Sequence, residues 1–230
     1  SRGLGDVYKR QEFALSDGTR CLLSGKIDRL DGTFDEAGTR FFRVIDYKTG
    51  SAEFSYTDLY YGLKLQLPLY LAAVAAADDA AHRALPAGFY YLPVKTPVLE
   101  EGLSGEALLK EVQKAFRLRG VSLKNAELLE AGGGPSVAPE KGTGVLDPED
   151  FSAVAEFARR KAAQTAEAVR TGRAETAPYR KSKRDTACAR CDYASVCGFD
   201  PTFGGCTYRS VRTVKADAFL EEARHETVDE

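Results

Sequence analysis

Two short stretches decide the fold, GKIDRLD at residues 25–31 and VIDYKTG at residues 44–50. Each is apolar around its start and reads as a strand with one carboxylate, Asp28 in the first and Asp46 in the second. Side chains two residues apart on a strand point to the same face, so Lys48 should stand beside Asp46. Asp28 is expected to reach this pair from the neighbouring strand.

Two carboxylates and a lysine in this pattern suit phosphodiester cleavage. Paired carboxylates can hold a hard cation such as Mg²⁺, which prefers oxygen ligands. A bound metal lowers the pKa of a water molecule and offsets charge that builds on a phosphate. Lys48 would then orient that water or stabilise the extra charge. The alternative is a plain surface ion pair of Asp46 with Lys48, which the apolar flanks disfavour because charge beside a core strand is costly without a partner.

A helix is predicted over residues 57–77, with Ser55 or Thr57 as its N-cap. Pro68 lies inside this span and should kink the helix, because proline removes a backbone hydrogen bond. The apolar stripe that supports the helix is formed by Leu59, Leu63, Leu67, Leu71 and Val74.

Gln66 and Tyr70 are four residues apart and therefore share one face of this helix. An ordinary core tyrosine with a solvated glutamine is the alternative. The motifs G-x-I-D, D-Y-K-T-G and Q-x-x-x-Y, in this order and spacing, resemble the PD-(D/E)XK nucleases of the RecB-like branch. Residues 61–71 look more specifically like the C-terminal nuclease domain of the AddB-type subunit of bacterial helicase–nucleases.

The resemblance implies a role for each motif residue. The ligands of an Mg²⁺ or Mn²⁺ ion would be Asp28, Asp46 and the backbone carbonyl of Tyr47. A further ligand, a histidine or an acid, comes in this family from a helix before the first strand, and neither histidine of this chain has that context. The remaining catalytic positions would be Lys48, Gln66 and Tyr70.

The resemblance also implies an α/β fold with a restriction-endonuclease-like core, a mixed central sheet flanked by helices. The residue pattern predicts a hairpin over 13–26 that turns at Asp17-Gly18, and a second turn at 31–38. The remaining predicted elements are a buried strand at 86–94, a helix at 104–118, a family-type loop and short helix at 119–131, and a mobile loop at 131–146.

The longest helix is predicted to begin at Asp147-Pro148, an N-cap followed by a favoured first position, and to end at Gly172. It is interpreted as a scaffold helix. Its inward stripe is predicted to be Phe151, Val154, Ala158, Ala162, Thr165 and Val169.

Composition indicates a packed core, since 43% of the 230 residues are hydrophobic and 29% are charged. A net charge of −2 gives no sign of a nucleic-acid partner, so a basic groove would have to be local. No apolar run could span a membrane and no signal peptide is seen, which favours a cytoplasmic location without a membrane partner. The absence of methionine indicates a fragment.

Four regions are expected along the chain. Residues 1–11 resemble a non-native leader and are expected to have no functional fold. Residues 12–185 should form the nuclease core, residues 186–210 an iron–sulfur cysteine segment, and residues 211–230 an acidic tail.

A basic cluster, RKSKR, occupies residues 180–184. A solvated loop and a phosphate-binding loop are equally good interpretations, and the second would make DNA binding sensitive to salt. The candidate DNA contacts are Arg180, Lys181, Lys183 and Arg184.

Cys188, Cys191 and Cys197 follow the pattern C-x2-C-x5-C, which is typical of a metal site rather than of disulfides. Spacing leaves zinc and an iron–sulfur cluster open. The family resemblance implies a [4Fe–4S] cluster on these three cysteines, with a fourth ligand upstream of this fragment. Cys206 could substitute for that ligand, whereas Cys21 is expected to be a small buried hydrophobic residue.

The resemblance implies a DNA exonuclease domain of a helicase–nuclease that processes double-strand breaks for recombinational repair, paired with an A-type subunit. No G-x-x-x-x-G-K-[ST] signature occurs, so ATP hydrolysis would take place elsewhere in the assembly. One alternative is a non-catalytic DNA-binding or scaffold module. Another is the cluster-bearing nuclease of CRISPR adaptation, which is usually shorter between the helix motif and the cysteines.

Overall fold

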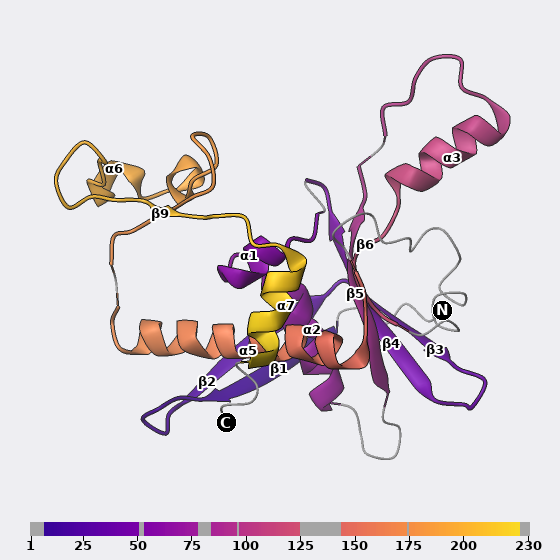
Figure 1. Cartoon of the computed structure of the whole chain (residues 1–230), viewed down its shortest axis with the longest axis horizontal. Helices are drawn as coiled ribbons and strands as arrows, with labels where there is room; N and C mark the ends of the chain where they lie inside the picture. Colours follow the sequence, from indigo (N-terminus) through magenta and orange to yellow (C-terminus); the bar gives the residue numbers. More distant parts are fainter. Residues whose placement is uncertain are drawn as a thin grey trace.

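A computed structural model describes residues 7–50, 53–77, 84–95, 97–124, 144–173 and 175–225, with side chains from residue 12 onward. Its centre is a five-stranded sheet in the order β3-β4-β5-β6-β7 (Figure 1). The β3–β4 and β5–β6 pairs are antiparallel, and the β4–β5 and β6–β7 pairs are parallel. The strands are β3 (Arg29–Phe34), β4 (Arg40–Lys48), β5 (Leu85–Pro93), β6 (Arg119–Leu123) and β7 (Val145–Leu146).

Helices cover one face of this sheet and form the main core with it. Apolar side chains of β4 and β5 alternate between the two faces, as the period of a strand requires. Val44 and Phe89, which are paired across β4 and β5, lie on the helix side and are fully buried. The other face carries a smaller cluster around Ile45 and Tyr90. The packing helices are α2 (Gln66–Ala77), α5 (Pro148–Arg170) and α7 (Ala216–His225).

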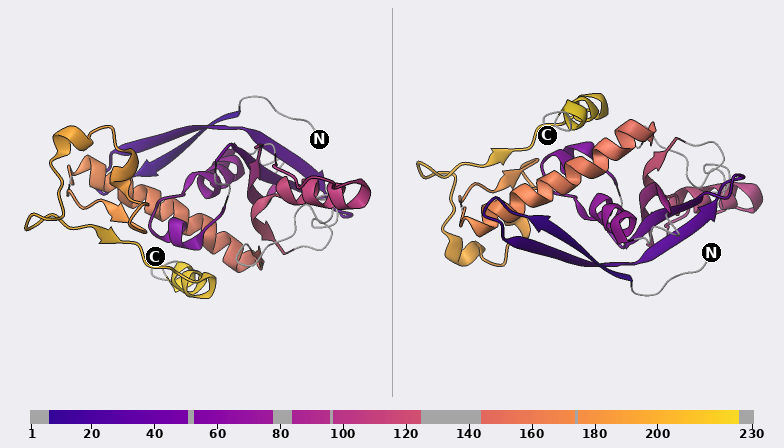
Figure 2. Two further views of the ribbon diagram at one scale, coloured as in Figure 1. Left: turned by 90° about the horizontal axis from the view of Figure 1, so that it is seen from above. Right: turned by 90° about the horizontal axis from the view of Figure 1, so that it is seen from below.

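A two-stranded hairpin, β1 (Val7–Ala14) with β2 (Arg20–Ile27), flanks α5 on the side away from α7 (Figure 2). The predicted turn at Asp17-Gly18 is confirmed, with Gly18 at a φ of 79° that favours glycine. The hairpin extends further than predicted, because the backbone of residues 7–11 pairs with β2. Residues 7–11 thus form part of a strand, and that residues 1–11 are a non-native leader without a functional fold stays a prediction.

The predicted helix over 57–77 is two helices, α1 (Tyr56–Tyr60) and α2. The chain turns between them at Gly62, whose φ is 73°. Ser55 is confirmed as an N-cap, since its hydroxyl accepts a hydrogen bond from the Asp58 N–H. The predicted kink at Pro68 is wrong, because this residue lies in the first turn of α2, where no intrahelical donor is needed.

Other boundaries also differ from the prediction. The turn placed at 31–38 lies at residues 35–39, so Asp31 belongs to β3. Residues 119–123 form β6 rather than a loop with a short helix, and residues 145–146 form β7 rather than part of a mobile loop. The rest of both predicted loops, residues 125–143, lies outside the described part of the chain.

The predicted strand at 86–94 and helix at 104–118 are confirmed as β5 and as α3 (Gly105–Ala115). The long helix α5 begins after Asp147 and ends before Gly172 as predicted, but its inward stripe is shorter. Thr165 and Val169 are exposed, because the second half of α5 extends beyond the sheet (Figure 1).

The C-terminal region leaves the end of α5 and returns to the core at α7 (Figure 1). It contains β8 (Tyr179–Arg180), paired in parallel with β9 (Arg209–Ser210), and two short helices, η3 (Ala187–Arg190) and α6 (Ala194–Cys197). Two bridges tie its end to α1. The Thr57 hydroxyl donates to the Val214 carbonyl and accepts from the Val214 N–H. The Arg212 N–H donates to the hydroxyl of Tyr61, the residue that follows α1.

Candidate active site

The C-terminal end of β4 presents an acid and a base on one face. Asp46 is 3% exposed, and Lys48 lies two residues further on the same side of the strand. The Lys48 ammonium is 2.5 Å from Asp46 Oδ2. The predicted pairing of these two side chains is therefore confirmed.

Asp28 joins this pair from a corner of the chain rather than from within a strand. It stands between Ile27, the last residue of β2, and Arg29, the first residue of β3, where the chain passes from one sheet to the other. Asp28 Oδ2 accepts a hydrogen bond of 2.9 Å from the Tyr47 N–H. The peptide between Asp46 and Tyr47 thereby holds Asp28 against the end of β4.

The environment of Asp46 disfavours its charged form. Burial raises the pKa of Asp46, and the nearby charge of Asp28 raises it further, while Lys48 lowers it. In the metal-free chain the stability contributed by protonated Asp46 is lost as pH rises through this raised pKa. A cation bound there must likewise displace a proton, so its affinity falls as pH drops through the same pKa.

A line of polar contacts links Lys48 to α2. Lys48 Nζ donates to Gln66 Oε1 at 3.2 Å, and Gln66 Nε2 donates to the Tyr70 hydroxyl at 3.3 Å. The predicted shared face of Gln66 and Tyr70 is therefore confirmed. The Tyr70 ring lies against Gly25, where an added Cβ would come within 2.5 Å of the ring. Glycine in the first motif is thus explained by the close approach of this tyrosine.

The ammonium groups of two lysines lie over the aromatic ring of Tyr91. Lys48 Nζ is 5.3 Å and Lys64 Nζ is 6.0 Å from the ring centre, distances at which a cation is attracted to the ring face. Burial, with the charges of Asp46 and Asp58, raises the pKa of Tyr91 to about 12. Tyr91 therefore stays neutral and acts as an uncharged platform. We call Asp28, Asp46, Lys48, Gln66 and Tyr70 the active-site cluster.

A second network, which the sequence reasoning missed, supports this cluster from the opposite face of the sheet. Asp31 is 7% exposed and accepts two hydrogen bonds from Arg29, at 2.7 and 3.0 Å, and two from Arg43, both at 3.2 Å. Arg29 also donates to the Tyr47 hydroxyl, and bonding to Asp31 and Tyr47 raises the pKa of Arg29. The R-x-D spacing of residues 29 and 31 places both on one strand face and could have indicated this network.

Arg29 and Tyr47 are each adjacent in sequence to a residue of the active-site cluster. Arg29 follows Asp28, and Tyr47 separates Asp46 from Lys48. The contact between Arg29 and Tyr47 therefore joins the chain beside Asp28 to the chain beside Asp46 and Lys48.

The cluster suits a hard divalent cation. Asp46 Oδ2 is buried, and no donor in the described part of the chain meets it with hydrogen-bond geometry, although Lys48 is close. Asp28 lies near enough to perturb Asp46 electrostatically. Two carboxylates beside a backbone carbonyl are the oxygen donors that Mg²⁺ accepts. Within the described residues, no group of three or more His, Cys, Asp or Glu side chains is arranged to hold a metal ion.

The basic cluster at 180–184 lies across α1 from this site. Lys181 Nζ is 2.6 Å from Asp58 Oδ1, and Arg180 stacks over the Tyr208 ring at 4.9 Å. Arg184 borders a groove of about 790 Å³, and Lys183 is exposed. Two of the four candidate DNA contacts are thus engaged within the protein.

The cysteines are all free thiols. Cys191 and Cys197 are exposed, while Cys188 and Cys206 are half-buried. Cys188, Cys191 and Cys197 do not form a ready-made metal site in the described chain, so the iron–sulfur cluster stays a prediction. Cys21 is half-buried and packs against the main core, less deeply than predicted.

Comparison with known proteins agrees with this site. Residues 5–198 match the PD-(D/E)XK nuclease superfamily. The chain is similar to proteins named as the B subunit of an ATP-dependent helicase/deoxyribonuclease. The protein of Alkaliphilus metalliredigens is 31% identical, and the match covers 93% of this chain and 20% of that protein. The protein of Clostridium tetani is 33% identical, and the match covers 97% of this chain and 21% of that protein. The protein of Moorella thermoacetica is 34% identical, and the match covers 87% of this chain and 19% of that protein.

The mixed sheet ends in an acid–lysine pair beside a second acid, an arrangement that suits phosphodiester cleavage. The chain belongs to the PD-(D/E)XK nuclease superfamily, and within it resembles the B subunits of helicase–nucleases. It spans about a fifth of the length of these curated relatives. No helix in the described part of the chain combines the length and apolar character needed to cross a membrane.

Proposed function

We propose that this chain is a metal-dependent deoxyribonuclease domain that acts as an exonuclease within a helicase–nuclease, processing double-strand breaks for recombinational repair. The observation that carries the proposal is the convergence of Asp28, Asp46 and Lys48 at the end of β4. A scaffold has no need of paired acids with a lysine. Membership of a nuclease superfamily and likeness to deoxyribonuclease subunits support the same conclusion.

The residues divide the chemistry among them. Asp28 and Asp46, with the backbone carbonyl of Tyr47, would hold Mg²⁺ or Mn²⁺. When bound, the ion supplies an acidic water and offsets charge on the phosphate. Lys48 orients the attacking water or balances the developing negative charge. Gln66 holds Lys48 in place through its hydrogen bond, and Tyr70 holds Gln66.

DNA is the proposed substrate, and an A-type subunit is the proposed partner in a cytoplasmic heterodimer. The names of the relatives join a helicase activity to a deoxyribonuclease, and ATP hydrolysis would occur outside this chain. Arg180, Lys181, Lys183 and Arg184 would bring positive charge to the DNA backbone, with the salt sensitivity that phosphate contacts cause.

Cys188, Cys191 and Cys197 are proposed to bind a [4Fe–4S] cluster, with a fourth ligand from outside these residues. Thiolates suit such a cluster, and the three side chains fall within ten residues of one another. The cluster would fasten the C-terminal region to the nuclease core.

Mg²⁺-dependent cleavage of single-stranded DNA tests the proposal. Asp46→Asn removes a metal-binding charge without changing the side-chain shape, and cleavage should fall by about 1,000-fold. Asp35→Asn in the β3–β4 turn is the matched control, because asparagine can still accept from the Thr39 N–H. Release of labelled nucleotides, measured with and without EDTA, follows the reaction. DNA binding without cleavage in the unsubstituted protein would instead favour a scaffold.

A further inference from the structure

A polar groove separates the nuclease core from the C-terminal region. One wall is the start of α1 with the residues just before it, and the other is the chain from 179 to 190. The groove has a volume of about 790 Å³, and Val211 and Thr213, which follow β9, also line it. Figure 1 shows these two parts of the chain on the same side of α5.

Basic side chains outnumber acidic ones in the lining of this groove. Lys64, Lys181, Arg184 and Arg190 contribute four positive charges, against three carboxylates. Asp58 is one of these acids and is 5% exposed, with Lys64 Nζ at 3.3 Å and Lys181 Nζ at 2.6 Å. Because Asp58 carries one negative charge and the two lysines carry two positive charges, this group has a net charge of plus one.

The other charges in the groove reinforce this excess. Glu53 lies 3.6 Å from Arg119, outside the lining, so its charge is partly balanced there. Arg184 and Arg190 are exposed, and their guanidinium groups make no ion pair in the described part of the chain. Asp185 is the third acid. The groove thus offers two uncommitted planar cations of the type that binds phosphate in a bidentate manner.

The lining favours a phosphate backbone over stacked bases. Among the described lining residues Tyr179 is the one aromatic side chain, whereas base-stacking sites use several aromatic rings. Contacts to phosphate carry no sequence information. The volume lies in the range of small-ligand pockets and has room for a few nucleotides of one strand.

The groove begins beside the active-site cluster. Lys64 borders the groove, and its ammonium lies over the same Tyr91 ring as the ammonium of Lys48. Lys64 thus places one side chain of the groove lining beside the ring that Lys48 also contacts.

We propose that this groove binds the sugar–phosphate backbone of a single DNA strand whose scissile linkage lies at Asp46 and Lys48. The inference rests on the proposed nuclease function and adds the path of the strand. Arg184 and Arg190 bind phosphates, and Asp58 positions Lys64 and Lys181 on the two walls.

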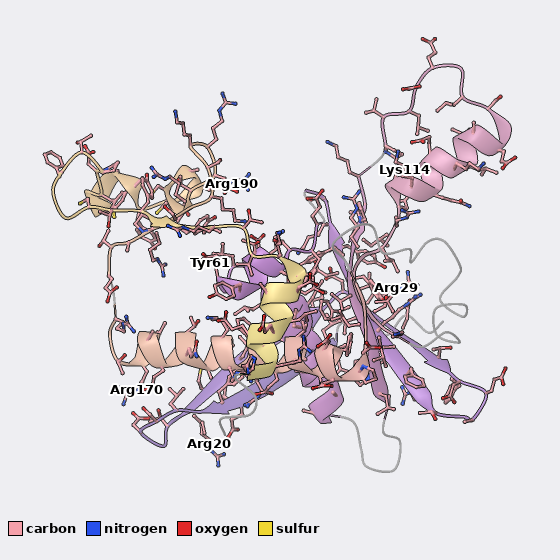
Figure 3. The ribbon with its side chains drawn as sticks, viewed as in Figure 1. Arg20, Arg29, Tyr61, Lys114, Arg170 and Arg190 are labelled. Atoms are coloured by element: carbon pink, nitrogen blue, oxygen red, sulfur yellow. The ribbon has the colours of Figure 1, made fainter. Side chains whose placement is uncertain are left out.

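Fluorescence anisotropy of labelled oligothymidine in EDTA tests the path without cleavage. Arg184→Gln with Arg190→Gln should weaken binding about tenfold, and the slope of log affinity against log salt should fall by about 1.4, because each single-strand phosphate contact contributes about 0.7. The matched control is Lys110→Gln with Lys114→Gln on the exposed helix α3, far from the groove (Figure 3). Circular dichroism verifies that both variants are folded.

Unchanged binding by the arginine variant, equal losses in both variants, or equally tight binding of duplex DNA would each overturn the proposal. Weaker binding by the arginine variant alone, with a preference for the single strand, supports it. Failure of the nuclease function gives a different result. Cleavage in Mg²⁺ would then be absent in the unsubstituted chain, while anisotropy in EDTA reports the groove independently.

Discussion

The active-site cluster and the cysteine segment (residues 186–210) are built in opposite ways. In the cluster, Asp46 lies on a buried strand and the Tyr70 ring lies against Gly25. In the cysteine segment none of the side chains is buried, and Tyr193 and Phe203 are 72% and 67% exposed.

The difference shows where the shape of each region comes from. Burial of apolar surface fixes the cluster before any metal arrives. The cysteine segment has local turns and two short helices, and none of its side chains is buried. A metal cluster on its cysteines, as proposed above, would supply the cross-link that a buried core supplies elsewhere.

Truncating one phenylalanine in the core and one in the cysteine segment should give the largest difference in stability between the two regions. Phe157→Ala removes a ring that is 2% exposed, and the free energy of unfolding should fall by about 3–5 kcal/mol. Phe203→Ala should change it by less than about 0.5 kcal/mol. Urea unfolding followed by circular dichroism measures both values. Similar losses would mean that the cysteine segment has a core of its own.

Gly25→Ala should test whether the packing of Tyr70 against Gly25 is needed to position Lys48. The added Cβ would displace Tyr70 and with it Gln66 and Lys48, so cleavage should fall by about 100-fold. Gly32→Ala, also in a strand, meets its nearest atom at 3.6 Å and should change cleavage less than about twofold. Equal rates for the two variants would contradict the positioning of Lys48 by Tyr70.

Arg29→Lys should show that the opposite face of the sheet positions the acids. Lysine loses the two-pronged bond to Asp31, so cleavage should fall about tenfold and the Mg²⁺ concentration for half-maximal rate should rise. The control is Arg20→Lys in the hairpin, where the side chain is 73% exposed. A lower rate with an unchanged Mg²⁺ requirement would indicate a general effect on folding.

The smallest effect on the core is expected from the cysteines. Replacing Cys188, Cys191 and Cys197 by serine should remove iron from anaerobically purified protein, while unfolding of the core shifts by less than about 0.5 kcal/mol. Iron analysis and visible absorbance measure the first, and urea unfolding the second. Stoichiometric zinc without iron would defeat the cluster prediction.

The sequence predicted the site better than it predicted the connections around it. Asp46 and Lys48 could be placed on one face because strand periodicity is strict over two residues. The break between α1 and α2 was missed because the apolar stripe runs on through Gly62 and Leu63, where a turn substitutes for the helix. Helix periodicity alone does not register a residue at positive φ.

Longer-range partners were beyond the reach of local patterns. The pairing of Asp31 with Arg43 joins two strands across a turn that was predicted to begin four residues too early. The contact of Lys181 with Asp58 crosses more than a hundred residues of sequence. Such pairs depend on topology, which the motifs indicate only through family resemblance.

The corner at Asp28 couples the hairpin to the reaction centre. One residue separates the last pair of the β1–β2 ladder, Val7 with Ile27, from the first pair of the β3–β4 ladder, Arg29 with Ile45. Because no loop lies between the two ladders, a change in the angle of the hairpin would move the backbone of Asp28 directly. The backbone position of Asp28, the proposed metal ligand, is therefore set by both ladders at once.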